Sequence, residues 1–125
     1  MVHIFLPGMI ERKFGKIVSI CSAVTLNPLP SSVVYTATKY GVKGFMNTLY
    51  DELCINDYDK FINLTTVYPD FMNTRKDLID VLEKIKHIPL LITPTRVADE
   101  SIMAMKKRMR NAHVNDNYFT YFMVK

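Results

Sequence analysis

The stretch that decides the fold is GKIVSICSAVTLNPLPSSVVYTATKYGVKGF, residues 15–45. Its β-branched run at residues 17–21 predicts a short buried strand. The segment Ser22–Pro30 contains two prolines and predicts a loop. Ser31 or Ser32 is then expected to cap a long helix, because a serine hydroxyl can accept a hydrogen bond from a free backbone N–H of the first turn.

A βαβ unit follows from the next two elements. The helix is expected to reach about Asn56, and FINLTTV at residues 61–67 predicts a second buried strand. Two strands joined by such a helix form a parallel sheet with a right-handed crossover, so the fold class is α/β. The other predicted elements are the end of a helix at residues 1–13, helices at 74–87 and 94–110, and an incomplete strand at 118–124.

The long helix carries an apolar stripe that predicts its buried face. The stripe recurs at helical spacing and consists of Val34, Ala37, Gly41, Phe45, Leu49 and Leu53. Gly41 and Gly44 are unfavourable in a helix, so they predict close packing against another element. Phe45, Leu49 and Leu53 are expected in the core or at a dimer interface.

Composition places the chain among ordinary globular domains. It has 125 residues, 49% hydrophobic and 22% charged, which suits one domain spanning residues 1–125. The net charge of +4 is scattered apart from a cluster at 106–110, which we interpret as a solvated helix end rather than a nucleic-acid site. The two cysteines and three histidines have no metal-ligand spacing, so neither a metal site nor a disulfide framework is predicted.

Tyr35 and Lys39 are the candidate catalytic pair. They are four residues apart and share one helix face, and an ammonium group beside a phenol favours the phenolate form that proton transfer requires. Ser22, thirteen residues before Tyr35, offers a hydroxyl that could hold a substrate oxygen. The same spacing recurs at Tyr121 and Lys125, but no strand-like run and no serine at the matching position precede that pair. The surroundings therefore separate the two pairs.

These residues are predicted to meet at one edge of the sheet. Ligands of open parallel sheets bind outside the carboxyl ends of the strands. Ser22 follows the first strand, Pro69 follows the second, and the loop that leads to Tyr35 runs along the same edge. A loop serine and a helical tyrosine–lysine pair are weak signals singly, and this shared context strengthens both.

Residues 15–45 resemble the catalytic segment of the short-chain dehydrogenases/reductases. The resemblance spans Phe5 to about Ala104 and depends on the strand that ends in serine, the tyrosine–lysine pair and VYPDFMNT at residues 67–74. FLPGMIERKFGKIVSICS, YPDFMNT and IPLLITPTRVA look closest to the branch of 17-beta-hydroxysteroid dehydrogenases type 11 and 13 and epidermal retinol dehydrogenases. The family implies a Rossmann-like, doubly wound parallel sheet.

The resemblance implies a catalytic role for three residues. Tyr35 would move the hydroxyl proton, and Ser22 would bind the substrate oxygen. Lys39 would favour the phenolate of Tyr35, and both would contact the nicotinamide cofactor, Lys39 through the ribose hydroxyls. Hydride would pass directly between the nicotinamide and the substrate carbon. The substrate would be a lipophilic alcohol or ketone, such as a steroid or a retinoid.

The resemblance also implies a second segment that binds the cofactor, which would be NAD or NADP with NAD slightly favoured. Pro69–Thr74 would wrap the nicotinamide end, with the backbone of Met72 and the residue Thr74 near the carboxamide. The family usually has glycine where this chain has Asp70. The residue that separates NAD from NADP is expected outside the matching segment.

Two motifs of the family are absent from the sequence. Its four glycines form no glycine-rich turn that could seat a pyrophosphate, and no Asn-Asn-Ala-Gly motif occurs. We therefore expect the catalytic C-terminal half of a Rossmann-type domain without its first βαβ units, and no turnover by this chain alone. Such a half should expose an edge strand and an uncovered sheet face. The alternative to an oxidoreductase is an inactive truncated remnant or a fragment that binds a partner.

Partners and location follow from the resemblance alone. The helix that carries the tyrosine often packs against its copy in this family, so a homodimer is implied for the full-length protein. No nucleic-acid partner is expected. Close relatives are anchored at the endoplasmic reticulum membrane or at lipid droplets, which is the implied location of the full-length protein.

Overall fold

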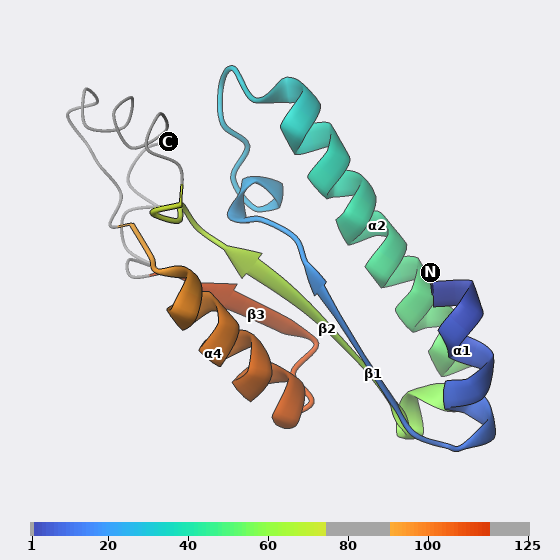
Figure 1. Ribbon diagram of the computed structural model, residues 1–125. Coiled ribbons are helices and arrows are strands. Elements are labelled where there is room, and N and C mark those ends of the chain that lie inside the picture. The colour runs from blue at the N-terminus through green and yellow to red at the C-terminus, as the bar shows by residue number, and fades with distance from the viewer. Residues whose placement is uncertain (1, 75–90, 116–125) are drawn as a thin grey trace.

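The computed structural model describes residues 2–74 and 91–115, which form a layered α/β structure (Figure 1). In this part of the chain, parallel strands form a sheet with helices on both faces. The strands are β1 (Gly15–Ile20), β2 (Ile62–Pro69) and β3 (Asn111–Val114); the helices are α1 (Val2–Glu11), α2 (Val33–Ile55) and α4 (Pro94–Lys106); short 3₁₀ turns are η1 (Ala23–Thr25) and η2 (Tyr58–Lys60). The predicted α/β fold class is confirmed.

The predicted βαβ unit is present. β1 pairs in parallel with β2 over six residue pairs, from Gly15 opposite Ile62 to Ile20 opposite Val67, and α2 connects the two strands. The β-branched residues of these runs suit the half-buried pleated surface of a sheet. Ser32 precedes α2 as predicted, but its hydroxyl makes no capping bond to the helix.

β3 is a strand that the sequence analysis did not predict. The four residues NAHV at 111–114 pair in parallel with the end of β2, from Thr66 opposite Asn111 to Pro69 opposite Val114. A run this short, interrupted by asparagine and histidine, lacks the continuous apolar pattern of a buried strand. The strand predicted at 118–124 and nearly all of the helix predicted at 74–87 lie outside the described residues.

α1 and α2 cover one face of the sheet (Figure 1). The buried side chains of this core come from α2 and β2 and are Met46, Leu49, Leu53, Ile62 and Leu64. The predicted stripe is therefore correct at its C-terminal end. Phe45 is 49% exposed and therefore outside this core, which leaves its place at a dimer interface a prediction, and the earlier stripe residues Val34, Ala37 and Gly41 are exposed as well. The buried residues of α2 all lie in its second half, because only that half faces the sheet and α1 closely.

The two glycines of α2 do not mark a close approach in the described part of the chain. A Cβ atom built on Gly41 or on Gly44 would meet no atom within 4 Å. The predicted close packing at these positions is therefore wrong. Both glycines lie in the half of α2 that carries little of the core.

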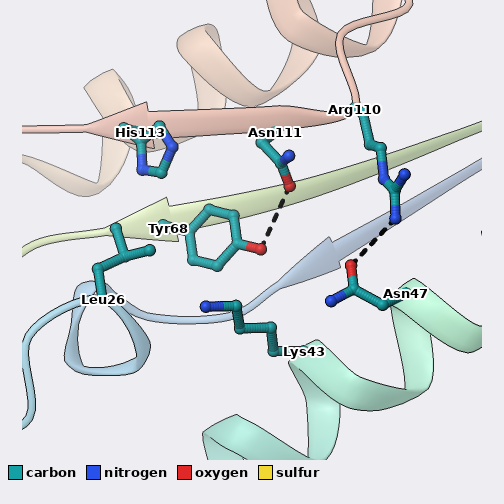
Figure 2. Close-up of a pocket in the computed structure, with 7 residues that line it drawn as sticks. All are labelled: Leu26, Lys43, Asn47, Tyr68, Arg110, Asn111 and His113. Carbon is teal, nitrogen blue, oxygen red and sulfur yellow. Dashed lines mark hydrogen bonds between the residues drawn. The ribbon is translucent and has the colours of Figure 1, made fainter.

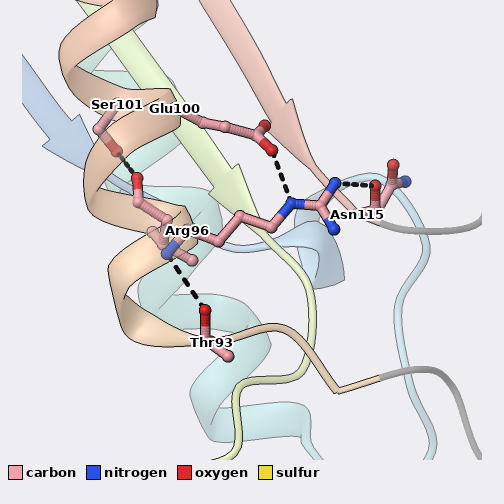
Figure 3. A network of polar contacts seen from close by, with 6 residues as sticks. Thr93, Arg96, Glu100, Ser101 and Asn115 are labelled. Atoms are coloured by element: carbon pink, nitrogen blue, oxygen red, sulfur yellow. Dashed lines mark hydrogen bonds and ion pairs between the residues drawn. The ribbon is translucent and has the colours of Figure 1, made fainter.

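α4 covers the other face, over β2 and β3. Its core consists of Val67, Ile92, Val97, Ala104, Ala112 and Val114. The helix begins where Thr93-Pro94 predicts it, because the Thr93 hydroxyl accepts a hydrogen bond from the Arg96 backbone N–H at 3.2 Å (Figure 3). The Arg96 side chain also donates to the Glu100 carboxylate at 2.8 Å and to the Asn115 carbonyl at 3.4 Å. These bonds connect the start of α4 to the residue that follows β3.

The basic cluster at 106–110 is more than a solvated helix end. α4 ends at Lys106, four residues earlier than predicted. Arg108 donates to two backbone carbonyls of η2, at 3.0 and 3.1 Å. The guanidinium carbon of Arg110 lies 3.7 Å from the centroid of the Tyr50 ring on α2. The two arginines therefore connect the residues that precede β3 to η2 and to α2.

β1 lies at an edge of the sheet in the described part of the chain. Ile17 packs against the core of α1 and α2, so Val18 and Ile20 point to the opposite face, where both are exposed. α4 lies mainly over β2 and β3, so it leaves Val18 and Ile20 of β1 uncovered. The predicted edge strand and the predicted uncovered sheet face are therefore both present. Among the described residues, no helix has the length and apolar character needed to span a membrane.

Candidate active site

The carboxyl edge of the sheet brings the ends of β1 and β2 side by side. Ser22 and Pro69 each lie two residues beyond the Ile20–Val67 pair of the parallel register. The Cys21 backbone N–H donates to the Val67 carbonyl at 2.7 Å and extends this pairing by one step. The structure therefore places Ser22 and Pro69 at one edge, as predicted.

Ser22 begins the 3₁₀ turn η1 directly after β1. It is only 8% exposed, and its hydroxyl oxygen accepts a hydrogen bond from the Val24 backbone N–H at 3.4 Å. Its carbonyl accepts from the Thr25 hydroxyl at 2.9 Å, so the turn is held from both sides. A serine hydroxyl can accept and donate at the same time, so capping leaves its hydrogen available to another oxygen.

Tyr35 and Lys39 lie on the first turns of α2, next to the end of β1. The Lys39 ammonium nitrogen is 5.8 Å from the centroid of the Tyr35 ring and donates to the Ile20 carbonyl at 3.2 Å. The Cys21 thiol donates in turn to the Lys39 carbonyl at 3.4 Å. Two contacts therefore fix the lysine turn of α2 to the last residues of β1.

Tyr35 is partly open to solvent. The residue is 48% exposed, whereas Ser22 is buried beneath its turn. No hydrogen bond joins Ser22 to Tyr35 in the described part of the chain, so what the structure brings together directly is Lys39 and the end of β1. The matching pair Tyr121 and Lys125 lies outside the described residues.

The segment after β2 is held by pairing with the chain that leads into α4. The Ile92 N–H donates to the Phe71 carbonyl at 2.9 Å, and the Asn73 N–H donates to the Ile92 carbonyl at 3.1 Å. Met72 forms an isolated parallel bridge with Ile92 and packs against the core under α4. Thr74 is exposed. The predicted cofactor segment thus lies at the carboxyl edge, with the side chain of Met72 turned partly into the core.

The sequence of this chain matches a known protein family over more than half of its length. A model of the family described as short chain dehydrogenase matches residues 1–78, which include both strands of the βαβ unit and every predicted site residue. The chain belongs to the short-chain dehydrogenase family. The predicted family is therefore confirmed.

Curated relatives include enzymes of two kinds. Ketoacyl reductase HetN from Nostoc sp. is 26% identical over 125 residues, which cover 100% of this chain and 42% of HetN. Estradiol 17-beta-dehydrogenase 11 from Pongo abelii is 34% identical over 70 residues, which cover 56% of this chain and 23% of that protein. The second relative belongs to the branch that the sequence resembles. The chain spans less than half the length of these relatives.

Solved structures of the same fold agree with the topology. A 3-oxoacyl-[acyl-carrier protein] reductase with bound NAD from Brucella melitensis superposes with a TM-score of 0.69 at 24% identity, over 90% of this chain and 44% of the reductase. The likeness extends the α/β assignment to the Rossmann-like fold of the short-chain dehydrogenases.

Two contacts of this short-chain dehydrogenase segment were missed by the sequence analysis. Cys21, to which the sequence assigned no role, bonds the lysine turn of α2. The Lys43 ammonium donates to the Thr25 carbonyl at 3.0 Å and so holds the serine turn from the other side. A signal for Lys43 was present, because it follows Lys39 by four residues and must lie on the same helix face.

Proposed function

We propose that this chain supplies the proton-transfer centre of a nicotinamide-dependent oxidoreductase that interconverts an alcohol and a ketone. The observation that carries the proposal is the double contact between Lys39 and the end of β1, from its ammonium to Ile20 and from Cys21 to its carbonyl. This contact sets the Tyr35 turn of α2 beside the edge at which Ser22 leaves the strand.

The residues would divide the reaction as follows. During reduction of a ketone, the Tyr35 hydroxyl would give its proton to the substrate oxygen, and during oxidation of an alcohol it would take that proton back. The Ser22 hydroxyl would donate a hydrogen bond to the same oxygen and hold it in place. The Lys39 ammonium would stabilise negative charge on Tyr35 in either direction. The nicotinamide, when bound, supplies the acceptor or donor of the hydride.

The residues present suit the nicotinamide end of the cofactor. An ammonium group has three hydrogens, and Lys39 uses one for Ile20, so the others can reach ribose hydroxyls. Pro69–Thr74 lies at the same edge and can border the ring. The sequence contains no glycine-rich turn for the pyrophosphate, so we expect no turnover by residues 1–125 alone. Detectable nicotinamide-dependent turnover by this chain would overturn that expectation.

The proposed substrate is a lipophilic secondary alcohol or the matching ketone, of steroid or retinoid size. HetN is named a ketoacyl reductase and the Pongo relative an estradiol dehydrogenase, and both names describe a carbonyl or hydroxyl carbon on an apolar skeleton. We propose NAD, and not NADP, as the cofactor. The related reductase with bound NAD supports this choice.

A chimera provides the test. Residues 1–74 of this chain would replace the matching segment of the estradiol dehydrogenase, and the appearance of reduced nicotinamide would be followed with estradiol as substrate. Tyr35→Phe should lower kcat by about 10²–10⁴-fold. Tyr40→Phe is the matched control, because Tyr40 is 44% exposed and has its own lysine 5.6 Å from the ring centroid. An active chimera in which both variants behave alike would refute the role of Tyr35.

A binding fragment is the second candidate function. Exposed Val18 and Ile20 on the uncovered face of β1 favour it, since an apolar sheet face beside an edge strand readily accepts a partner.

For the full-length protein we also propose a homodimer through α2, supported by exposed Val34 and Phe45, and a location at the endoplasmic reticulum membrane or lipid droplets. Sedimentation and cell fractionation test these two proposals.

A further inference from the structure

A cavity lies between α2 and the strands β2 and β3, beside the carboxyl ends of these strands. It measures about 270 Å³ and is lined by Leu26, Lys43, Asn47, Tyr68, Arg110, Asn111 and His113 (Figure 2). None of the predicted catalytic or cofactor-binding residues lines it. It opens on the face of the sheet that α2 covers, on the side of β3.

Two cations face this cavity from different elements. The Lys43 ammonium comes from α2, and the Arg110 guanidinium comes from the segment before β3 (Figure 2). The hydrogen-bond partners of both are neutral: Lys43 donates to the Thr25 carbonyl at 3.0 Å, and Arg110 donates to the Asn47 side-chain oxygen at 3.2 Å. Among the residues described, neither forms a salt bridge, and no carboxylate lines the cavity. The positive charge of the cavity is therefore not balanced by an acidic side chain there.

The strand side of the cavity is formed by neutral polar groups. The rings of Tyr68 and His113 stack with centroids 5.0 Å apart, and the Tyr68 hydroxyl donates to the Asn111 side-chain oxygen at 3.2 Å. Burial raises the pKa of Tyr68 and lowers the pKa of His113. At neutral pH both rings therefore stay uncharged and add no charge that would cancel the two cations.

Spare hydrogen-bond donors accompany the two charges. A lysine ammonium has three donors and a guanidinium has five, so each retains donors beyond the bond it makes in the protein. A carboxylate or phosphate group is the natural acceptor for such a pair, because charge-assisted bonds from lysine and arginine are among the strongest hydrogen bonds. The volume exceeds the space of several water molecules, which take about 30 Å³ each in the liquid. It can hold an anionic group with a small organic body.

We propose that this cavity binds a compact oxyanion, held between Lys43 and Arg110 and packed against the stacked rings of Tyr68 and His113. Inorganic phosphate represents the bare anion, and benzoate represents an anion with an apolar body that can use the ring faces. The site is independent of the proposed oxidoreductase activity, although Lys43 also holds Thr25 in the serine turn.

The test uses the 125-residue chain and the proton NMR signals of its imidazoles. His113 reports the cavity, while His3 on α1 does not line it and serves as the internal reference. Binding of either probe should shift the His113 signal saturably and raise its titration midpoint, because a nearby anion favours the imidazolium form. Phosphate alone binding would assign a bare-anion site, and tighter binding of benzoate would assign an organic carboxylate. Parallel shifts of His113 and His3, or no saturable shift, would overturn the proposal.

Substitutions of Lys43 make the assignment specific. Lys43→Met should weaken the binding of the better probe by about tenfold or more, as expected when a hydrogen bond from a charged group is lost. Lys107→Met removes the same charge from an exposed position outside the cavity and should leave the affinity nearly unchanged. Lys43→Arg keeps a cation and should retain most of the affinity, which guards against a folding defect in Lys43→Met. The proposal would be overturned if Lys43→Met and Lys107→Met bound the better probe with equal affinity. It would also be overturned if both Lys43→Arg and Lys107→Met lost binding.

Discussion

Met46 and Phe45 are neighbours on α2. The structure buries Met46, whereas the apolar stripe of the sequence contains Phe45. Met46 is 4% exposed in the core under α1 and α2, whereas Phe45 is 49% exposed. Truncation of a buried methionine to alanine lowers the free energy of unfolding by about 2–5 kcal/mol. Full burial of a large apolar side chain contributes about 1.5–3 kcal/mol, so the half-exposed Phe45 should contribute only about 1 kcal/mol. Met46→Ala should therefore be clearly the more destabilising change.

Urea unfolding followed by circular dichroism measures both effects. Small domains lose about 1–3 kcal/mol of stability per molar urea, so Met46→Ala should lower the midpoint by about 1 M or more. Phe45→Ala should lower it much less, and the exposed Ile55→Ala provides a control for the change in helix propensity. A loss in Phe45→Ala that matches the loss in Met46→Ala would refute the assignment of the buried face.

The same pair also tests the proposed homodimer. Phe45 would lie at an interface through α2, so its contribution should grow as the protein concentration rises, whereas that of Met46 should not. The midpoint of each variant would be measured at a low and a high protein concentration. If the Phe45→Ala effect stays independent of concentration, Phe45 is not part of a dimer interface in this chain.

Three further predictions concern other parts of the molecule. Because burial lowers the pKa of His113 below its usual value of about 6.5, the unfolded chain binds that proton more readily. The free energy of unfolding should thus rise with pH up to about 6.5, by at most about 1.4 kcal/mol per pH unit, and urea titrations of His113→Asn should lack that part of the slope. Thr93→Ala removes the N-cap of α4 and should destabilise by about 0.5–2 kcal/mol, measured against Thr95→Ala; equal losses would exclude a capping role. Charging the uncovered face with Val18→Lys and Ile20→Lys should leave association through α2 unchanged in sedimentation, and a loss of association would place the contact on β1 instead.

The parts of the fold that the sequence predicts are those with a local cause. β1, α2 and β2 each carry a periodic or continuous apolar pattern long enough to be recognised on its own. β3 does not, because four residues between a basic turn and a polar segment form a strand only by pairing with the end of β2. The exposure of Phe45 has a similar origin, since helical spacing identifies a face but the neighbouring layer decides how far along the helix that face is covered.

The candidate site divides in the same way. The meeting of Ser22 and Pro69 was predictable, because parallel strands with a known order bring their carboxyl ends together. Helical spacing puts Lys43 on the face of Lys39, but the bonds from Cys21 to Lys39 and from Lys43 to Thr25 were not predictable, because they depend on the angle at which α2 passes the end of β1. The cavity beside β3 could not be anticipated at all without the strand that forms its wall.

The comparison of Tyr35 with Tyr40 shows what the surroundings add to a tyrosine–lysine contact. Lysine nitrogens lie 5.8 and 5.6 Å from the two ring centroids, and the rings are nearly equally exposed, so neither distance nor exposure selects one tyrosine for catalysis. The difference lies in what each lysine binds. Lys39 bonds the last residue of β1, at the edge where parallel sheets bind ligands, whereas Lys43 bonds the turn beyond it and faces the cavity. The two Tyr→Phe substitutions each remove a hydroxyl beside a lysine. Unequal effects on kcat would therefore show that activity depends on the position of the tyrosine at the sheet edge and not on the tyrosine–lysine contact alone.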